Sequence, residues 1–211
     1  PIAILGAGRT DAGVHARGMV AHVDLPMSPD EARQLIYRTD RYLPHDIALY
    51  DIRPVREEAH ARFSATSRTY RYYVTLRKDP FQEARMLRLY FPLDFDRMNE
   101  AAGRLKDFTD FTSFSKLHTD VKTNNCRVTE AYWQVGSEEG QWIFTITADR
   151  FLRNMVRAVV GTLFQVGKGR LSVEDFCAVI EAKDRGQAGS SAPAHALYLE
   201  QVGYPEDLYL D

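Results

Sequence analysis

Hydrophobic side chains recur at helical spacing in four stretches of the chain, and capping signals mark several of their ends. The first stretch follows Ser28, because a serine, a proline in the first turn and Glu31 three residues later form a capping box. Its apolar stripe stops before Pro44, and Gly167 ends the longest stretch. The pattern predicts helices over residues 28–43, 94–105, 150–166 and 172–183.

Alternating apolar and polar positions predict strands in much of the remaining chain. In the clearest example, residues 66–76, Tyr70 and Tyr72 fall on one face while Arg71 and Tyr73 fall on the other. Strands are predicted over residues 14–25, 48–55, 66–76, 85–91, 128–135, 142–148 and 196–202.

Strands therefore outnumber helices, and many follow one another directly. The strands at 128–135 and 142–148 flank a charged turn, which predicts a hairpin. Phe108, Phe111 and Phe114 are expected in the core. The pattern as a whole indicates an α+β fold built on antiparallel sheet with helices on one side, and no linker or low-complexity segment separates domains.

Composition places the chain among ordinary globular proteins, with 211 residues, 45% hydrophobic and 27% charged. That length suits one substantial domain or two small ones that share a core. We expect no membrane span and no signal peptide. The two cysteines are unpatterned and indicate a reduced, cytoplasmic setting. The six histidines lack metal-ligand spacing, so no metal site is expected.

The distribution of charge leaves a polyanionic partner open, although the formal net charge is −2. Residues 171–211 contain two bases and eight acids, which gives them a net charge of −6. The other 170 residues carry a net charge of +4. An excess of bases in one part of a chain is the distribution expected for nucleic-acid binding.

Candidate chemistry centres on a glycine-lined loop, GRTDAGVHA (8–16), in which Asp11 follows Arg9 by two residues. Hydrophobic residues surround the loop on both sides. Because glycines let a ligand approach the backbone, the loop can present one ionised acid at the floor of a cleft. Read alone, it also fits an Asx turn, with the Asp11 side chain bonded to its own backbone near Gly13.

A dinucleotide-binding loop is disfavoured at the same place. Gly6-Ala7-Gly8 follows an apolar run, as that fingerprint requires, but its third glycine position holds Asp11. A carboxylate there would repel a pyrophosphate. The residues from Val14 onward also alternate like a strand, whereas the fingerprint opens a helix.

The helix predicted for residues 150–166 carries a second chemical signal on its polar side. That side comprises Arg150, Arg153, Asn154, Arg157 and Gly161. A solvated face is the ordinary interpretation. However, this face has three arginines and no acids, and its glycine costs about 1 kcal/mol of helix propensity. Arginine forks suit phosphate or carboxylate, so Arg150 and Arg153 are expected to bind substrate. One arginine could also pair with Asp11, since a cation within about 4–6 Å favours a charged carboxylate.

Tyrosines and arginines interleave along the segment SRTYRYY (67–73). Aromatic and cationic side chains on a strand can stack an unpaired base and hold its phosphate. Ordinary cross-strand aromatic packing is the alternative interpretation.

Together, these segments resemble the tRNA pseudouridine synthase A family. The matching stretches are AGRTDAGVHA (7–16), HARFSATSRTYRYY (60–73), DFTSF (110–114), FLRNMVRAVVG (151–161) and AGSSAPAHALYL (188–199). Each stretch is weak evidence alone, but the set follows the family's order, reaches nearly from end to end and is highly specific. The resemblance implies that Asp11 is the catalytic aspartate and pairs with Arg157. It also implies that Arg9 helps to displace the target base, that Tyr70 stacks on that base and that Leu197 lines the base pocket.

The resemblance further implies two similar halves whose antiparallel or mixed sheets join into one extended sheet, with helices on one side. We expect residues 1–92 to form the half with the aspartate loop and residues 93–211 the half with the arginine-rich helix. The family begins with a strand and a helix before the aspartate loop, and we expect both to be absent here. The implied substrate is uridine at positions 38–40 of the tRNA anticodon stem-loop. The implied enzyme is a cytoplasmic homodimer without metal or cofactor.

Such an isomerisation breaks a carbon–nitrogen glycosidic bond, turns the uracil and joins its C5 to the same sugar carbon. Glycoside hydrolases use two carboxylates, but here the base rebonds, so one acid suffices. Asp11 could attack the sugar carbon, attack C6 of uracil or take a proton from the sugar. Two other functions compete. A non-catalytic RNA-binding module has no need of Asp11, and a hydrolase of small phosphorylated sugars needs a second acid that the sequence does not supply.

Overall fold

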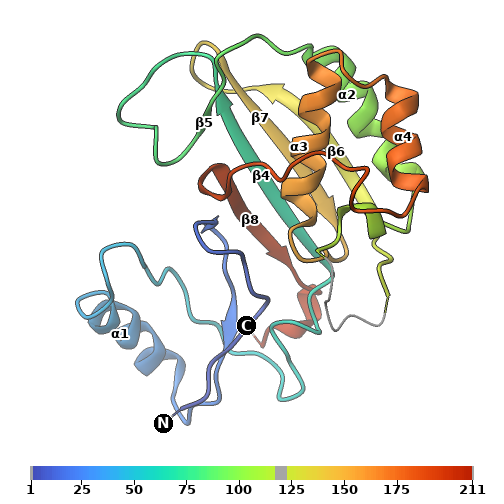
Figure 1. Ribbon diagram of the computed structural model, residues 1–211. Helices are drawn as coiled ribbons and strands as arrows, with labels where there is room; N and C mark the ends of the chain where they lie inside the picture. Colours follow the sequence, from blue (N-terminus) through green and yellow to red (C-terminus); the bar gives the residue numbers. More distant parts are fainter. Residues whose placement is uncertain (1, 117–122, 211) are drawn as a thin grey trace. The chain divides into compact units, whose positions relative to one another are not determined.

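The computed structural model describes residues 2–116 and 123–210 (Figure 1). The chain divides into two compact units. Unit 1 comprises Pro1–Gly8, Val20–Ala65 and Tyr204–Asp211, and unit 2 comprises Arg9–Met19 and Thr66–Gly203. The two halves that the resemblance implies, 1–92 and 93–211, stay a prediction.

Unit 1 contains a helix and a short sheet. Strands β1 (Leu5–Gly6) and β3 (Ala21–His22) pair antiparallel, and helix α1 spans Pro29–Thr39. The predicted capping box is present: the Ser28 hydroxyl accepts the Glu31 amide at 3.3 Å, and the Ser28 amide donates to the Glu31 carboxylate at 2.7 Å. The helix prediction is therefore confirmed, although the helix ends earlier than residue 43.

The strand predicted over residues 48–55 is wrong. In this stretch, which lies wholly within the described chain, Val55 forms an isolated bridge with Tyr209 and no strand is present. The side chain of Tyr50 within the stretch is exposed, as is that of Ile47 just before it. Alternation here buries no face, and Pro54 has no amide hydrogen to give to a ladder.

The described part of unit 2 forms one six-stranded sheet in the order β2-β8-β4-β7-β6, with β5 beside β4. Four longer strands pair antiparallel, namely β4 (Ser67–Thr75), β6 (Val128–Val135), β7 (Gln141–Ala148) and β8 (Leu197–Gly203). The short strands β2 (His15–Ala16) and β5 (Leu87–Arg88) pair parallel with β8 and β4. These elements confirm the predicted hairpin and the strands at 66–76, 85–91 and 196–202, the strand at 85–91 in a two-residue form.

The strand predicted over residues 14–25 is confirmed only in part. Four of its residues are paired, as β2 and β3, and the chain bends between them. Gly18 lies at this bend, and a Cβ added there would overlap the carbonyl oxygen of Glu200 on β8. The close approach to β8 requires a residue without a side chain, and it ends the regular alternation.

Three helices of unit 2 lie on one face of its sheet (Figure 1). They are α2 (Phe95–Arg104), α3 (Met155–Gly167) and α4 (Val173–Glu181). Their aromatic residues pack against the strands: the Phe95 ring stacks on Trp142 at 3.9 Å, and Phe164 lies edge-on to Tyr72 at 6.2 Å. Short 3-10 turns occur at Leu105–Asp107, Thr112–Phe114, Ala194–Ala196 and Glu206–Leu208. The α+β class is therefore confirmed.

Helix α3 begins five residues later than predicted, and the arginine-bearing helix face is partly wrong. Its N-cap, Asn154, has φ of 66°, a left-handed conformation that interrupts the helix. Before it, the Asp149 carboxylate accepts the Arg150 amide at 2.7 Å and fixes a turn. Arg150 and Arg153 consequently precede α3 and do not share a face with Arg157.

Aromatic and aliphatic side chains between the sheet and these helices form the core of unit 2. Phe111 and Phe114 are fully buried, and Phe108 packs against the same cluster, as predicted. Within residues 2–116 and 123–210, no helix combines the length and hydropathy that crossing a bilayer requires.

Candidate active site

Asp11 lies on the loop before β2, and its carboxylate is turned toward α3. The Asp11 side-chain oxygen accepts the Arg157 guanidinium at 2.9 Å. The turn itself is closed by main-chain atoms, since the Asp11 carbonyl accepts the Val14 amide at 3.1 Å. Gly13 takes φ of 82° in this turn. The carboxylate therefore faces a guanidinium, rather than its own backbone as in the Asx turn.

Arg157 is held from two sides in the first turns of α3. Its Nη1 donates to Asp11, and its Nε donates to the Ala192 carbonyl at 2.7 Å. The Ala192 amide in turn donates to the Arg157 carbonyl at 2.9 Å. The side chains of Arg157 and Asp11 remain 21% and 25% exposed. The ion pair is thus fixed in orientation but still reachable by a ligand.

The segment that contains Ala192 is itself fixed by a polar network. Arg185 donates to the Gly189 carbonyl at 3.2 Å and to the Ser191 hydroxyl at 3.1 Å. The Asn154 amide group also donates to Ser191, at 2.6 Å. Sequence reasoning did not find Arg185 or the main-chain carbonyl of Ala192. The small-residue run at 188–192 was the available signal, because small side chains permit close backbone packing.

Gly161 belongs to this packing. In the sequence this glycine stood out for its cost in helix propensity, and in the structure another backbone segment of the chain approaches it closely. A Cβ added at Gly161 would overlap the Ser190 carbonyl oxygen and lie 2.9 Å from its carbonyl carbon. The missing side chain therefore admits the loop that positions Arg157.

Tyr70 is partly buried on the helix-covered face of β4, between Ile146 of β7 and Leu199 of β8. Its ring meets Phe151 edge-on at 5.2 Å. Burial raises the pKa of the Tyr70 hydroxyl; the Arg68 charge lowers it and the Asp11 charge raises it further. The structure therefore joins Asp11 to Arg157, and Tyr70 lies within range of the Asp11 charge.

The other expected site residues are less closely connected. Leu197 begins β8 and is buried in the core, with 4% of its surface exposed. Arg9 is exposed, and its side chain has no ion pair or hydrogen bond with any described residue. Arg150 and Arg153 lie before α3, on either side of Phe151 in the sequence. Roles in substrate binding stay predictions for all four.

A metal site finds no support in the described chain. Across the described residues, no cluster of three or more histidine, cysteine or acidic side chains could hold a metal ion. The site offers one carboxylate, one guanidinium that orients it and an aromatic ring beside them. Such a set can carry acid–base or nucleophilic chemistry at a single carboxylate.

Comparison with known proteins gives first the class and then the family. A family model described as tRNA pseudouridine synthase matches residues 104–205. The tRNA pseudouridine synthase A of Porphyromonas gingivalis is 64% identical over 211 residues, which cover 100% of this chain and 84% of the relative. The enzyme of Parabacteroides distasonis is 59% identical over 210 residues, covering 99% and 82%. That of Streptococcus thermophilus is 37% identical over 206 residues, covering 97% and 83%. The chain belongs to the tRNA pseudouridine synthase A family.

Proposed function

We propose that this protein isomerises uridine to pseudouridine at positions 38–40 of the tRNA anticodon stem-loop, as a cytoplasmic homodimer without metal or cofactor. The observation that carries the proposal is the ion pair between Asp11 and Arg157 at 2.9 Å, with the Tyr70 ring nearby. The names of the relatives, tRNA pseudouridine synthase A, support the class of reaction.

The reaction needs little more than one carboxylate. The C1′–N1 bond breaks, the uracil turns, C1′ bonds to C5, and the hydrogen on C5 leaves as a proton while N1 gains one. Neither an oxidant nor a transferred group enters. Asp11 supplies the carboxylate that attacks the sugar carbon or C6, or takes the sugar proton. Arg157 holds that carboxylate in one orientation through its contacts with Asp11 and Ala192.

Base access is the second requirement, because Asp11 cannot reach a uridine that remains stacked in RNA. Unstacking costs a few kcal/mol. In the proposal Arg9 occupies the vacated position, Tyr70 stacks on the displaced base and Leu197 borders it. Arg9 is exposed, as a side chain entering a helix of RNA must be.

The proposed reaction predicts release of the C5 hydrogen. A tRNA transcript labelled with tritium at C5 of uridine should lose tritium to water, and substitution of cytidine at positions 38–40 should abolish the release. A non-catalytic RNA-binding module and a sugar-phosphate hydrolase both leave the label in place. Retention of tritium by a folded, tRNA-binding protein would overturn the assignment.

Replacing Tyr70 tests its role in stacking. Tyr70→Leu should lower the rate of pseudouridine formation by roughly tenfold to a hundredfold, since stacking on an aromatic ring contributes about 1–3 kcal/mol per base. Tyr70→Phe keeps the ring and should stay within a few-fold of the wild type. Single-turnover rates measure both. An unchanged rate in Tyr70→Leu would restrict the tyrosine to packing against Phe151.

A further inference from the structure

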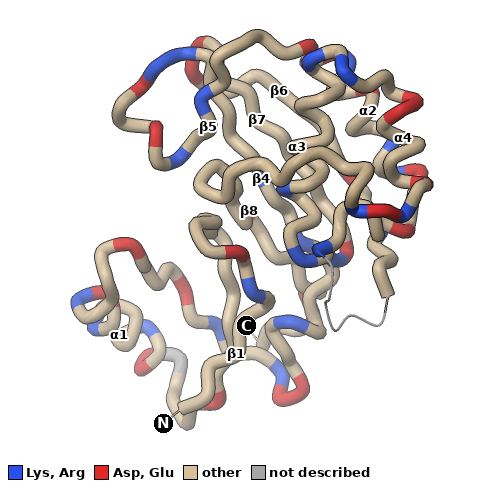
Figure 2. Tube along the Cα trace, viewed as in Figure 1, with Lys and Arg blue, Asp and Glu red and all other residues tan. Residues whose placement is uncertain are grey.

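Four arginines meet at one end of the sheet of unit 2, where β4, β7 and β6 lie side by side. Arg68 of β4 is paired with Ala148 of β7, which is also opposite Val128 of β6. The neighbouring residues along these strands include Arg127 and Arg150, and Arg153 follows three residues later. Arg68, Arg127, Arg150 and Arg153 are called the arginine rim below. Figure 2 shows lysine and arginine positions gathered near the start of α3.

Asp149 organises the rim without neutralising it. Its carboxylate accepts the main-chain amides of Arg127 at 2.8 Å and Arg150 at 2.7 Å. Its carbonyl accepts the Arg68 guanidinium at 2.8 Å. The only acid among these five residues thus binds the backbone amides of two arginines with its carboxylate and the guanidinium of a third with its carbonyl. The rim and Asp149 together carry a net charge of +3.

The guanidinium groups of Arg127, Arg150 and Arg153 have no ion pair or hydrogen bond with the described residues of the chain. Three other arginines of unit 2 differ: Arg77 pairs with Glu139 at 2.7 Å, and Arg97 and Arg104 pair with aspartates. Arg127 and Arg153 are also exposed. Arginine forks without a carboxylate suit phosphate groups from another molecule.

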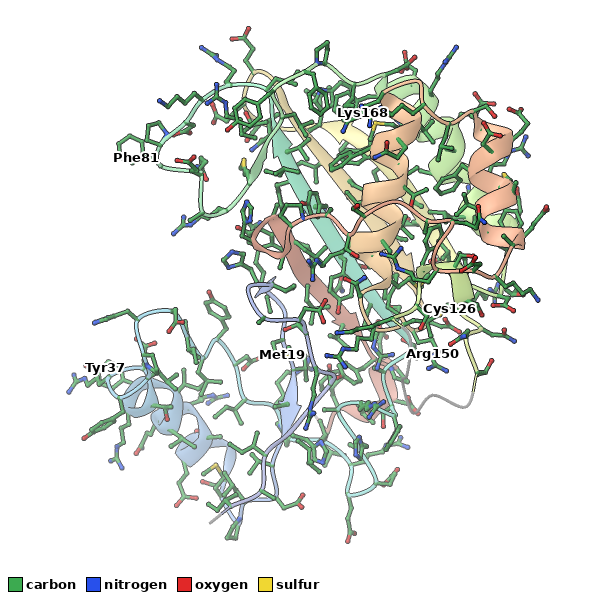
Figure 3. The ribbon with its side chains drawn as sticks, in the orientation of Figure 1. Met19, Tyr37, Phe81, Cys126, Arg150 and Lys168 are labelled. Atoms are coloured by element: carbon green, nitrogen blue, oxygen red, sulfur yellow. The ribbon has the colours of Figure 1, made fainter. Side chains whose placement is uncertain are left out.

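The rim adjoins the candidate active site. Phe151 lies between Arg150 and Arg153 in the sequence, and its ring packs edge-on against Tyr70. The charges of Arg68 and Asp11 both act on the Tyr70 hydroxyl. Burial raises the pKa of the Cys126 thiol to about 12. Arg150 lies near this thiol (Figure 3), and its charge acts in the opposite direction, lowering the pKa.

We infer that the arginine rim binds the phosphate backbone of the RNA strand beside the target uridine, and so holds the strand while the base turns toward Asp11. This inference rests on the proposed function. It adds Arg68 and Arg127 to the substrate-binding residues and gives Arg150 and Arg153 a backbone-binding role. Contacts of this kind position a nucleic acid without reading its sequence.

The test is the salt dependence of tRNA binding by R127Q/R150Q/R153Q. The control R77Q/R97Q/R104Q removes the same charge from exposed positions of unit 2 outside the rim. The probe is a labelled tRNA transcript with cytidine at positions 38–40, so that binding is measured without conversion. Each phosphate contact contributes about 0.7–0.9 to the slope of log K against log salt, so loss of three contacts should reduce the slope by roughly 2–3.

The rim variant should also bind roughly tenfold more weakly at 0.1 M salt, and the control should bind within about twofold of wild type. With a convertible transcript, KM should rise while kcat stays within a few-fold of the wild-type value. Thermal unfolding of each variant, and of R127Q and R153Q alone, checks the fold. Equal slopes and affinities for the two triple variants would overturn the inference. Failure of the tritium test would overturn the proposed function alone, since binding is measured on a transcript that cannot react.

Discussion

Asp11→Asn should abolish pseudouridine formation while the protein still folds and binds tRNA. Asparagine has the same size as aspartate and keeps an oxygen that can accept the Arg157 guanidinium, so the loop before β2 should keep its position. It lacks the negative charge and basicity that proton transfer or attack requires. Among the described residues, Asp11 is the one carboxylate paired with Arg157, so we expect a loss of at least roughly 10³-fold, or about 4 kcal/mol of activation free energy.

Single-turnover tritium release and tRNA affinity, measured on the same preparation, separate chemistry from binding. Asp107→Asn is the matched control, because Asp107 also pairs with an arginine, Arg104, but lies on the surface with 61% of its side chain exposed. The control should turn over at the wild-type rate. If Asp11→Asn reacted at a rate within tenfold of wild type, the Asp11 carboxylate would not be catalytic, and the enzymatic proposal would fail.

Much of unit 2 could be predicted from the sequence because its local signals agree with its packing. The strand at 66–76 alternates, and its inward positions include Tyr72 and Val74, which are fully buried in the structure. Ser172 begins α4 with a complete capping box to Asp175. Where propensity, period and burial favour the same element, the prediction succeeds.

The predictions failed where long-range contacts override local periodicity. Residues 150–154 continue the apolar spacing of α3, yet the Asp149 carboxylate fixes a turn through amides of two different segments, and Asn154 is left-handed. No spacing rule reports a hydrogen bond to Arg127, which is 22 residues away. The alternation over 48–55 likewise predicted a strand, but alternation alone does not show whether a partner strand lies beside it.

The candidate site shows the same division. Residue type singled out Asp11 and indicated that one arginine of residues 150–166 could pair with it. The resemblance named Arg157, and the structure joins the two at 2.9 Å. The support of Arg157 could not be predicted, because it comes from a main-chain carbonyl, at Ala192, that the sequence does not distinguish from any other. In the sequence, this support is indicated only by the small residues, Gly161 among them, that let α3 and the segment containing Ala192 pack closely.

Gly161→Ala should destabilise the protein and impair the site, although alanine is the better helix former. Replacing glycine inside a helix ordinarily gains up to about 1 kcal/mol. Here the new methyl group would overlap the Ser190 carbonyl oxygen, and the atoms that must move are backbone. Overpacking of this kind typically costs about 1–3 kcal/mol, so the net change in free energy of unfolding should be negative. The Ser190 displacement would also shift Ala192 and release Arg157 from its acceptor.

Gly103→Ala is the control that isolates this effect. Gly103 is also helical, near the end of α2, and nothing lies within 4 Å of a Cβ added there. Gly103→Ala should therefore stabilise the protein by up to about 1 kcal/mol and raise Tm by roughly 2–4 °C, with activity unchanged. The Tm values of the two variants should move in opposite directions from the wild type, and only Gly161→Ala should lower the single-turnover rate. If Gly161→Ala behaved like Gly103→Ala, the close contact with Ser190 would not be what holds Arg157 against Asp11.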